Sequence, residues 1–159
     1  MSKSLYDEVL RKAGYSFIPA ILFFVVSLPE VYNTTNNLGS RLGQTDNRLS
    51  FNTFANDCPT STGKFLHSLV FFLLVWAVMR MSRNNGRMPY KSNGLLAKYA
   101  FYSTLIFFLL SSTDAYNVTS NLVSGLTNST GCPNMTGAIV HGLVFLVVLT
   151  LVMFFPKDE

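Results

Sequence analysis

The sequence CPTSTGKFLHSLVFF, residues 58–72, returns later in the chain as CPNMTGAIVHGLVFL, residues 132–146. The two copies keep a cysteine, a proline, a glycine and a histidine in register. Residues 15–38 likewise align with residues 99–122 without a gap. The matching pairs there include Tyr15/Tyr99, Phe23/Phe107, Ser27/Ser111, Tyr32/Tyr116, Asn33/Asn117, Thr35/Thr119 and Leu38/Leu122. The order of these segments predicts one structural unit that is used twice.

Each unit contains two apolar stretches, so the chain has four, at residues 15–28, 65–81, 99–110 and 138–155. Charged residues make up only 13% of the chain, about half the fraction in an ordinary soluble domain. A membrane span needs about 20 helical residues, which the second and fourth stretches approach and the others reach with their flanks. A soluble bundle would need polar stripes facing water, which these stretches lack. We therefore predict an all-α integral membrane four-helix bundle built from two parallel-repeat helical hairpins.

The predicted organisation has five parts. They are an amphipathic N-terminal segment (1–14), a first membrane hairpin (15–81), a basic cytoplasmic loop (82–94), a second membrane hairpin (95–155) and a charged C-terminal tail (156–159). The N-terminal segment is typical either of a short amphipathic helix, on the membrane surface or docked on a partner, or of an extension of the first span. A cleaved signal peptide is disfavoured, because Pro29 and Glu30 do not form a small-residue cleavage site.

Charge predicts the orientation of the spans. The region between the second and third spans is rich in basic residues and has no acidic residue; its cations are Arg80, Arg83, Arg87, Lys91 and Lys98. By the positive-inside rule, this loop and both termini are expected on the cytoplasmic side. The loop could also hold anionic lipid headgroups or an acidic partner. Because the net charge of +4 is placed as membrane flanks, we expect no nucleic-acid partner.

The two remaining loops carry features of an oxidising, lumenal compartment. They hold both cysteines, Cys58 and Cys132, at equivalent positions of the repeat, which makes a disulfide between them a candidate. They also hold four N-x-S/T triplets, at Asn33, Asn117, Asn128 and Asn134. These are candidate glycosylation sites, with chance occurrence in Asn/Ser/Thr-rich loops as the alternative.

Two polar faces recur inside the spans. Gly63 and His67 are four residues apart, as are Gly137 and His141, so each pair lies on one helical face. The glycines are expected to allow close helix packing. An intramembrane histidine indicates function by default, but no carboxylate lies at helical spacing beside either one. Hydrogen bonding between helices is therefore favoured over proton, ion or metal binding. No arrangement typical of catalysis is present, so neither an enzyme nor a cofactor is expected.

The first hairpin combines IPAILFFVVSLPEVYNTTNNL (18–38) with CPTSTGKFLHSLVFF (58–72), and the second echoes it with TLIFFLLSSTDAYNVTSNL (104–122) and CPNMTGAIVHGLVFL (132–146). This pattern resembles small multi-span virion membrane or minor capsid proteins of large icosahedral nucleocytoplasmic DNA viruses. The resemblance implies a structural protein of an internal virion membrane derived from the host endoplasmic reticulum. Its partners would be the lipid bilayer, capsid or other virion proteins, and a second copy of itself. The long polar loop at 32–64 would be the docking surface. The alternatives are a small tetraspan channel or transporter that uses the paired histidine faces, and an assembly adaptor of the endomembrane system.

Overall fold

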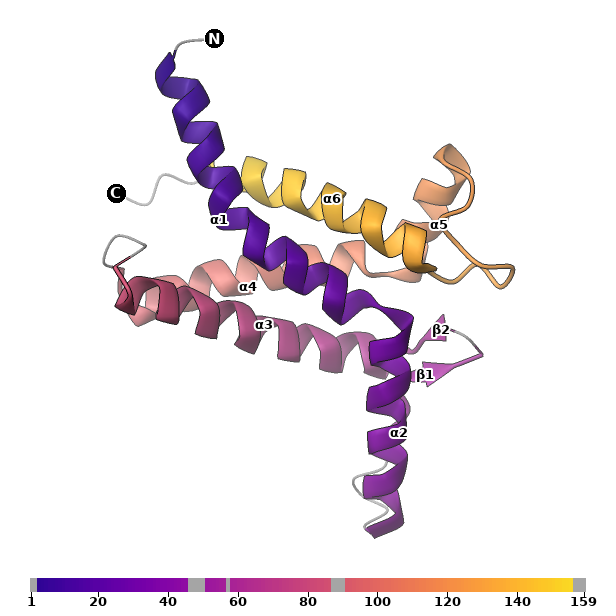
Figure 1. Cartoon of the computed structure of the whole chain (residues 1–159). Helices are drawn as coiled ribbons and strands as arrows, with labels where there is room; N and C mark the ends of the chain where they lie inside the picture. The colour runs from indigo at the N-terminus through magenta and orange to yellow at the C-terminus, as the bar shows by residue number, and fades with distance from the viewer. Residues whose placement is uncertain (1–2, 46–50, 57, 87–90, 156–159) are drawn as a thin grey trace.

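The computed structural model describes residues 3–45, 51–56, 58–86 and 91–155. Its elements are α1 (Lys3–Ser27), α2 (Pro29–Thr45), β1 (Phe54–Ala55), β2 (Cys58–Pro59), α3 (Ser61–Asn84), α4 (Asn93–Leu110), α5 (Thr113–Leu122) and α6 (Met135–Val152). The long helices α1, α3, α4 and α6 form a bundle, and α2 and α5 project from one end of it in opposite directions (Figure 1). Within the described residues, the fold is therefore helical apart from the short antiparallel pair β1–β2.

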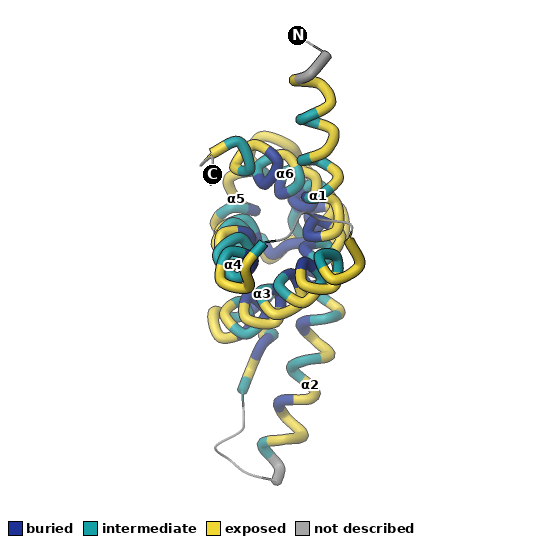
Figure 2. Tube along the Cα trace, turned by 90° about the vertical axis from the view of Figure 1, so that its left-hand side faces the viewer, coloured by how far each residue is buried: buried dark blue, intermediate teal, exposed yellow. Residues whose placement is uncertain are grey.

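Four helices, α1, α3, α4 and α6, are long and apolar enough to cross a membrane. Only 22% to 33% of each apolar window is buried inside the protein, so most of these apolar side chains face outward. Figure 2 shows this as exposed residues along the outer surface of the bundle. Outward apolar faces on all four helices are what a lipid environment requires, as in an integral membrane protein.

The bundle is held together mainly by two helix pairs, α1 with α6 and α3 with α4. The contacts of α1 with α3 and of α4 with α6 are less extensive. The strongest packing thus joins a helix of the first half to a helix of the second half. Consecutive spans within one half are not the best-packed partners.

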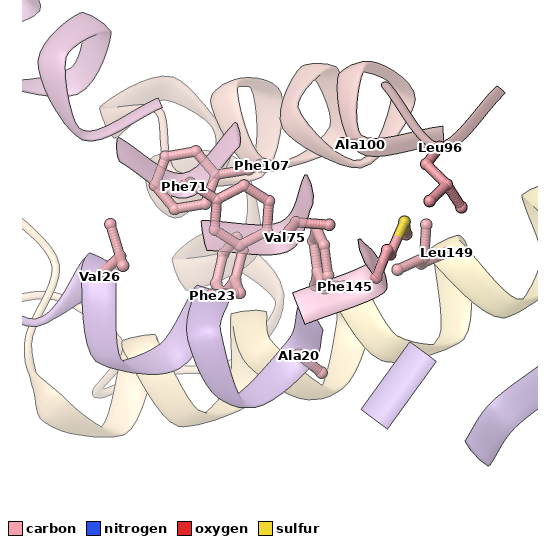
Figure 3. Packing of buried hydrophobic residues seen from close by; sticks show 11 residues of the cluster. Ala20, Phe23, Val26, Phe71, Val75, Leu96, Ala100, Phe107, Phe145 and Leu149 are labelled. Atoms are coloured by element: carbon pink, nitrogen blue, oxygen red, sulfur yellow. The ribbon is translucent and has the colours of Figure 1, made fainter. Parts of the chain in front are cut away.

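One phenylalanine from each spanning helix meets in the centre of the core (Figure 3). Phe23, Phe71, Phe107 and Phe145 are all fully buried. The Phe23 ring stacks on Phe145 with centroids 4.8 Å apart, and the Phe71 ring stacks on Phe107 at 4.5 Å. Since lipid tails are as apolar as these side chains, their contribution comes from close packing rather than from removal from water.

The prediction of a polar loop at residues 32–64 was wrong for its first part, because α2 continues to Thr45. The residue before a proline avoids helical geometry, so α1 ends ahead of Pro29, which then starts α2 at the position that proline favours. Glu30 adds a favourable charge near the start of α2. In the second half, the Ser112 side chain caps α5 by accepting a hydrogen bond from the N–H of Ala115 at 3.2 Å.

The two ends of the bundle differ in what they carry. The start of α1, the end of α6 and the facing ends of α3 and α4 lie at one end, while α2, β1, β2 and α5 lie at the other (Figure 1). We call the second the polar end. Because α1 runs from Lys3 without a break, residues 3–14 of the predicted N-terminal segment continue the first span. The tail 156–159 and Arg87 lie outside the described residues.

Candidate functional site

The first histidine lies where three elements meet at the polar end. His67, in the first part of α3, is only 2% exposed. Its Nδ1 lies 2.9 Å from the carbonyl oxygen of Val26, at the end of α1. Its Nε2 lies 2.9 Å from Thr35 Oγ1 on α2. The ring also stacks on Tyr32 of α2, with centroids 3.7 Å apart.

The second histidine has the same surroundings. His141, on α6, has Nδ1 2.8 Å from the carbonyl oxygen of Leu110 at the end of α4 and Nε2 2.7 Å from Thr119 Oγ1 on α5. It stacks on Tyr116, with centroids 3.8 Å apart. Each partner occupies the position that corresponds to its counterpart around His67 in the repeat. The two halves therefore build one geometry from equivalent residues.

The hydrogen-bond chemistry of these rings is determined by the backbone. A carbonyl oxygen can only accept, so Nδ1 of each histidine carries a proton and donates to Val26 or Leu110. In the neutral ring, Nε2 is then an acceptor for the single proton of the threonine hydroxyl, which also lies within hydrogen-bond distance of carbonyl oxygens in its own helix. The last carbonyls of a helix have no partner within the helix. Each histidine satisfies one of them and joins it to the next polar helix. We call each set, His67 with its partners and His141 with its partners, a histidine clamp.

Each clamp lies one turn from a glycine that contacts the connecting backbone. A Cβ atom at Gly63 would overlap the carbonyl of Thr53, and one at Gly137 would overlap the carbonyl of Leu126. These carbonyls also accept from Thr60 and Asn134, at 3.0 and 3.3 Å. The sequence suggested that these glycines would allow close packing of spanning helices. They instead allow the connecting segments of the polar end to approach α3 and α6 closely.

The starts of α3 and α6 are capped in the same way. Thr60 Oγ1 accepts from the N–H of Gly63 at 3.0 Å, and Asn134 Oδ1 accepts from the N–H of Gly137 at 2.8 Å. Side-chain oxygens at this position satisfy helix N–H groups that would otherwise have no partner. Both glycines are thus fixed by their own backbone N–H as well as by the segment that packs on them.

A disulfide joins the two halves at the polar end. Cys58, in β2, is bonded to Cys132, which precedes α6, and their Cα atoms are 5.3 Å apart. The bond links equivalent positions of the two copies across 74 residues of sequence. Together with the clamps, it ties both connecting segments to the ends of the spanning helices.

Four hydroxyls near the clamps are buried without a hydrogen-bond partner among the described residues. They belong to two equivalent pairs, Ser27 with Ser111 and Tyr32 with Tyr116. Burial raises the pKa of both phenols, Tyr32 and Tyr116, above the ordinary value. The same two tyrosines present their ring faces to the histidines, so their role in the clamp is to pack against the imidazoles.

The polar groups within the spans do not form a continuous path. Hydroxyls on α3, α4 and α6 donate to the carbonyl four residues earlier in their own helix; these are Ser68, Ser103, Thr104 and Thr150. The phenylalanine core lies between the clamps and three of these hydroxyls, those of Ser103, Thr104 and Thr150, whereas Ser68 is next to His67. In the described part of the chain, no three His, Cys, Asp or Glu side chains lie together in a way that could hold a metal ion.

The basic residues that were predicted to mark the cytoplasmic side lie at the opposite end of the bundle and are engaged locally. Arg83 donates to the carbonyl of Lys91 at 2.9 Å and to Asn93 Oδ1 at 2.8 Å. Arg80 lies over the ring of Trp76, and Lys98 lies over the ring of Tyr102. The described cations of this set thus lie together around the α3–α4 connection.

The four candidate glycosylation asparagines differ in their surroundings. Asn33 and Asn117 are exposed on α2 and α5. Asn134 Nδ2, the atom that a glycan would modify, donates to the carbonyl of Gly125 at 3.0 Å. Asn128 Oδ1 accepts from the backbone N–H of Cys132 at 2.8 Å. The geometry is therefore more open to modification at the first two positions.

The clamp partners were not identified from the sequence. Tyr32, Thr35, Tyr116 and Thr119 match in the alignment of the two halves, which was the available signal. They lie in segments that were interpreted as loops, so nothing indicated that they would reach a histidine. The carbonyls of Val26 and Leu110 carry no side-chain signal at all.

Comparison with known proteins gives no relative for this arrangement: no protein family, curated protein or solved structure matches the chain.

Proposed function

We propose that the chain is a structural membrane protein, in which two copies of one helical hairpin hold a rigid platform at one face of the bilayer. The observation that carries the proposal is the pair of histidine clamps, His67 and His141, built from equivalent residues. In both, the nitrogens of a buried imidazole are used to fix the end of one helix to the next. Such saturated hydrogen bonding suits a fixed joint rather than a group that exchanges protons.

The platform consists of α2, the β1–β2 pair, α5 and the segments that connect them to α3 and α6. It is supported by the Cys58–Cys132 bond between the two halves and by the close contact at Gly63 and Gly137. Its surface carries exposed apolar side chains on helices too polar to enter a bilayer; these are Leu38, Val118 and Leu122, and Val123 directly follows α5. Exposed apolar groups among polar ones are typical of protein contact sites.

We further propose that the platform attaches an internal virion membrane to the surrounding capsid shell, with both termini on the cytoplasmic side. The setting rests on the resemblance of both hairpins, through residues 18–38 with 58–72 and 104–122 with 132–146, to virion membrane proteins of large icosahedral DNA viruses. The orientation rests on the basic residues around the α3–α4 connection. The partner that binds the platform would be a capsid protein. The alternative partner is a second copy of this chain.

A channel or transporter that uses the histidine faces is the alternative, and the observations favour it less. Conduction would need polar groups along the bundle interior. In the described residues, Phe23, Phe71, Phe107 and Phe145 fill that interior, and the nearby hydroxyls donate to their own helices.

The direct experiment is quantitative proteomics of purified virus particles. The proposal expects the chain to co-purify in a fixed ratio to the capsid proteins and to cross-link to one of them through α2 or α5. Absence from purified particles, with the chain recovered only in other host membranes, would contradict the virion setting.

A charge on the platform provides a matched test of the docking surface. Leu122→Glu replaces a side chain that is 82% exposed on α5, so the bundle should be unaffected while capsid cross-linking falls. Asn121→Glu adds the same charge at the exposed neighbouring position without removing an apolar group, and should retain cross-linking. Equal cross-linking by both variants would argue against docking through this surface.

A further inference from the structure

A cavity of about 500 Å³ lies between the spanning helices at the end away from the platform. Its walls come from α1, α4, α6 and the last part of α3. The phenylalanine core fills the bundle centre, whereas the buried side chains at this end are smaller: Met79, Leu96, Ser103 and Leu149. Figure 2 looks along the bundle onto this end. The volume lies within the range of about 300 to 1,000 Å³ that is typical of small-molecule sites.

The floor of the cavity is apolar. Leu96 and Leu149 are 2% exposed and Met79 is 6% exposed. Ser103 is also buried, and its hydroxyl donates to the carbonyl of Tyr99 at 3.0 Å. The hydroxyl is thereby directed to its own helix backbone. A ligand that reaches the floor would therefore meet mainly hydrocarbon.

The rim of the cavity is cationic. Arg11 and Lys12 approach from α1, and Lys91 approaches from the segment before α4. Lys12 pairs with Glu8 at 2.8 Å, and its ammonium lies 3.7 Å from the Phe154 ring centroid. Lys91 Nζ donates to Tyr99 Oη at 3.0 Å. Among the described residues that line the cavity, three are cations and none is acidic, so the lining of the rim is positively charged.

We infer that this cavity binds an anionic phospholipid from the leaflet that meets this end of the bundle. The phosphate and any further acidic group of the head would lie against Arg11 and Lys91, and part of an acyl chain would enter towards Leu96 and Leu149. Basic pockets between spanning helices are typical sites for anionic headgroups. The combination of an apolar floor with a cationic rim selects an acidic amphiphile over a neutral lipid or a free anion.

The test uses the full-length chain purified in neutral detergent and incubated with mixed micelles of phosphatidylserine and phosphatidylcholine. Native mass spectrometry measures the lipid that remains bound. The parent chain is expected to retain phosphatidylserine in preference to phosphatidylcholine. Arg11→Gln combined with Lys91→Gln is expected to reduce that retention about 25-fold, at about fivefold for each cation.

The control variant removes the same charge elsewhere. Arg41→Gln with Arg80→Gln changes two exposed cations that do not line the cavity, and phosphatidylserine retention should be unchanged. Equal retention of both lipids by the parent, or equal losses in the cavity and control variants, would overturn the proposal.

A second pair of experiments separates the tail from the head. Ser103→Leu fills the floor without changing the charge and should abolish lipid retention, and Leu149→Phe serves the same purpose if the first variant does not fold. Glycerophosphoserine, which lacks acyl chains, should fail to displace bound phosphatidylserine. Displacement by this soluble head, or full retention in the filled variants, would show that the rim binds a free anion only and would contradict an amphiphile site.

Discussion

The imidazole of His67 lies face to face with the ring of Tyr32, with centroids 3.7 Å apart and 6° between the planes. His141 and Tyr116 repeat the relationship at 3.8 Å and 8°. In both halves the histidine comes from a returning span and the tyrosine from a polar helix that follows the preceding span. The stacking and the two hydrogen bonds of each ring together fix the direction in which the chain leaves the bilayer.

Replacing His67 by leucine should destabilise the protein. The change leaves the buried carbonyl of Val26 without its donor, at a cost of about 1–3 kcal/mol. His67→Asn places an amide N–H near the position of Nδ1 and should recover part of this loss. Thermal unfolding in detergent micelles measures both effects. His141→Leu should have a similar effect, because it removes the donor to the carbonyl of Leu110. A leucine variant as stable as the parent would refute the clamp.

Replacing both histidines distinguishes a structural role from proton transport. His67→Gln combined with His141→Gln should leave membrane incorporation intact, because glutamine retains a donor and an acceptor. We expect no proton flux in vesicles reconstituted with the parent chain, and none with the double variant. A flux in the parent that disappears in the double variant would support the transporter alternative instead.

Adding a methyl group at Gly63 should be costly. Its Cβ would overlap the backbone of Thr53, and overpacking of this kind costs about 1–3 kcal/mol. Gly14, on α1, has no heavy atom within 4 Å of a built Cβ. Gly14→Ala should therefore be neutral or stabilise by up to about 1 kcal/mol through its helix propensity. Equal unfolding temperatures for the two alanine variants would contradict the close approach.

Loss of the Cys58–Cys132 bond should loosen the platform. In the chain-entropy description, a bond that closes a loop across 74 residues contributes up to about 4.5 kcal/mol, and less if the unfolded chain stays inserted in the membrane. Cys58→Ser should lower the unfolding temperature and change the mobility on a non-reducing gel. Identical mobility of the parent and the variant would show that the bond does not form in the cell.

The stability of the protein should fall in alkaline solution because of Tyr32 and Tyr116. Burial holds their pKa values above the ordinary phenol value of about 10. Both states carry the neutral phenol at lower pH, but above about pH 10 the unfolded chain ionises first, so folding is disfavoured as pH rises. Tyr32→Phe with Tyr116→Phe should reduce this loss, and Tyr6→Phe, at an exposed phenol, should not.

The same double variant has a second expected result at neutral pH. Because both hydroxyls are buried without a partner among the described residues, their removal should be neutral or stabilise by about 1 kcal/mol each. A loss of more than about 1 kcal/mol for each hydroxyl would mean that they have hydrogen-bond partners, such as water.

The spanning helices could be predicted because length and hydropathy are local properties of the sequence. The pairing of α1 with α6 could not, since the apolar stretches of both helices lack a polar stripe and no single face of α6 is marked for contact. The polar helices α2 and α5 were missed because their composition resembles that of loops, although Pro29 and Ser112 were available as start signals. The histidines were recognised, and hydrogen bonding was the favoured role. Their partners depend on where α2 and α5 turn after leaving the bundle.

The central claim is that the platform and the α3–α4 connection lie on opposite sides of one membrane. Single cysteines at Ser40, exposed on α2, and at Asn85, exposed after α3, can be added while the native cysteines remain bonded. Sealed microsomes are then treated with a membrane-impermeant maleimide. We predict that Asn85→Cys reacts at once and that Ser40→Cys reacts only after detergent is added. Equal reaction of both positions in sealed microsomes would contradict the account.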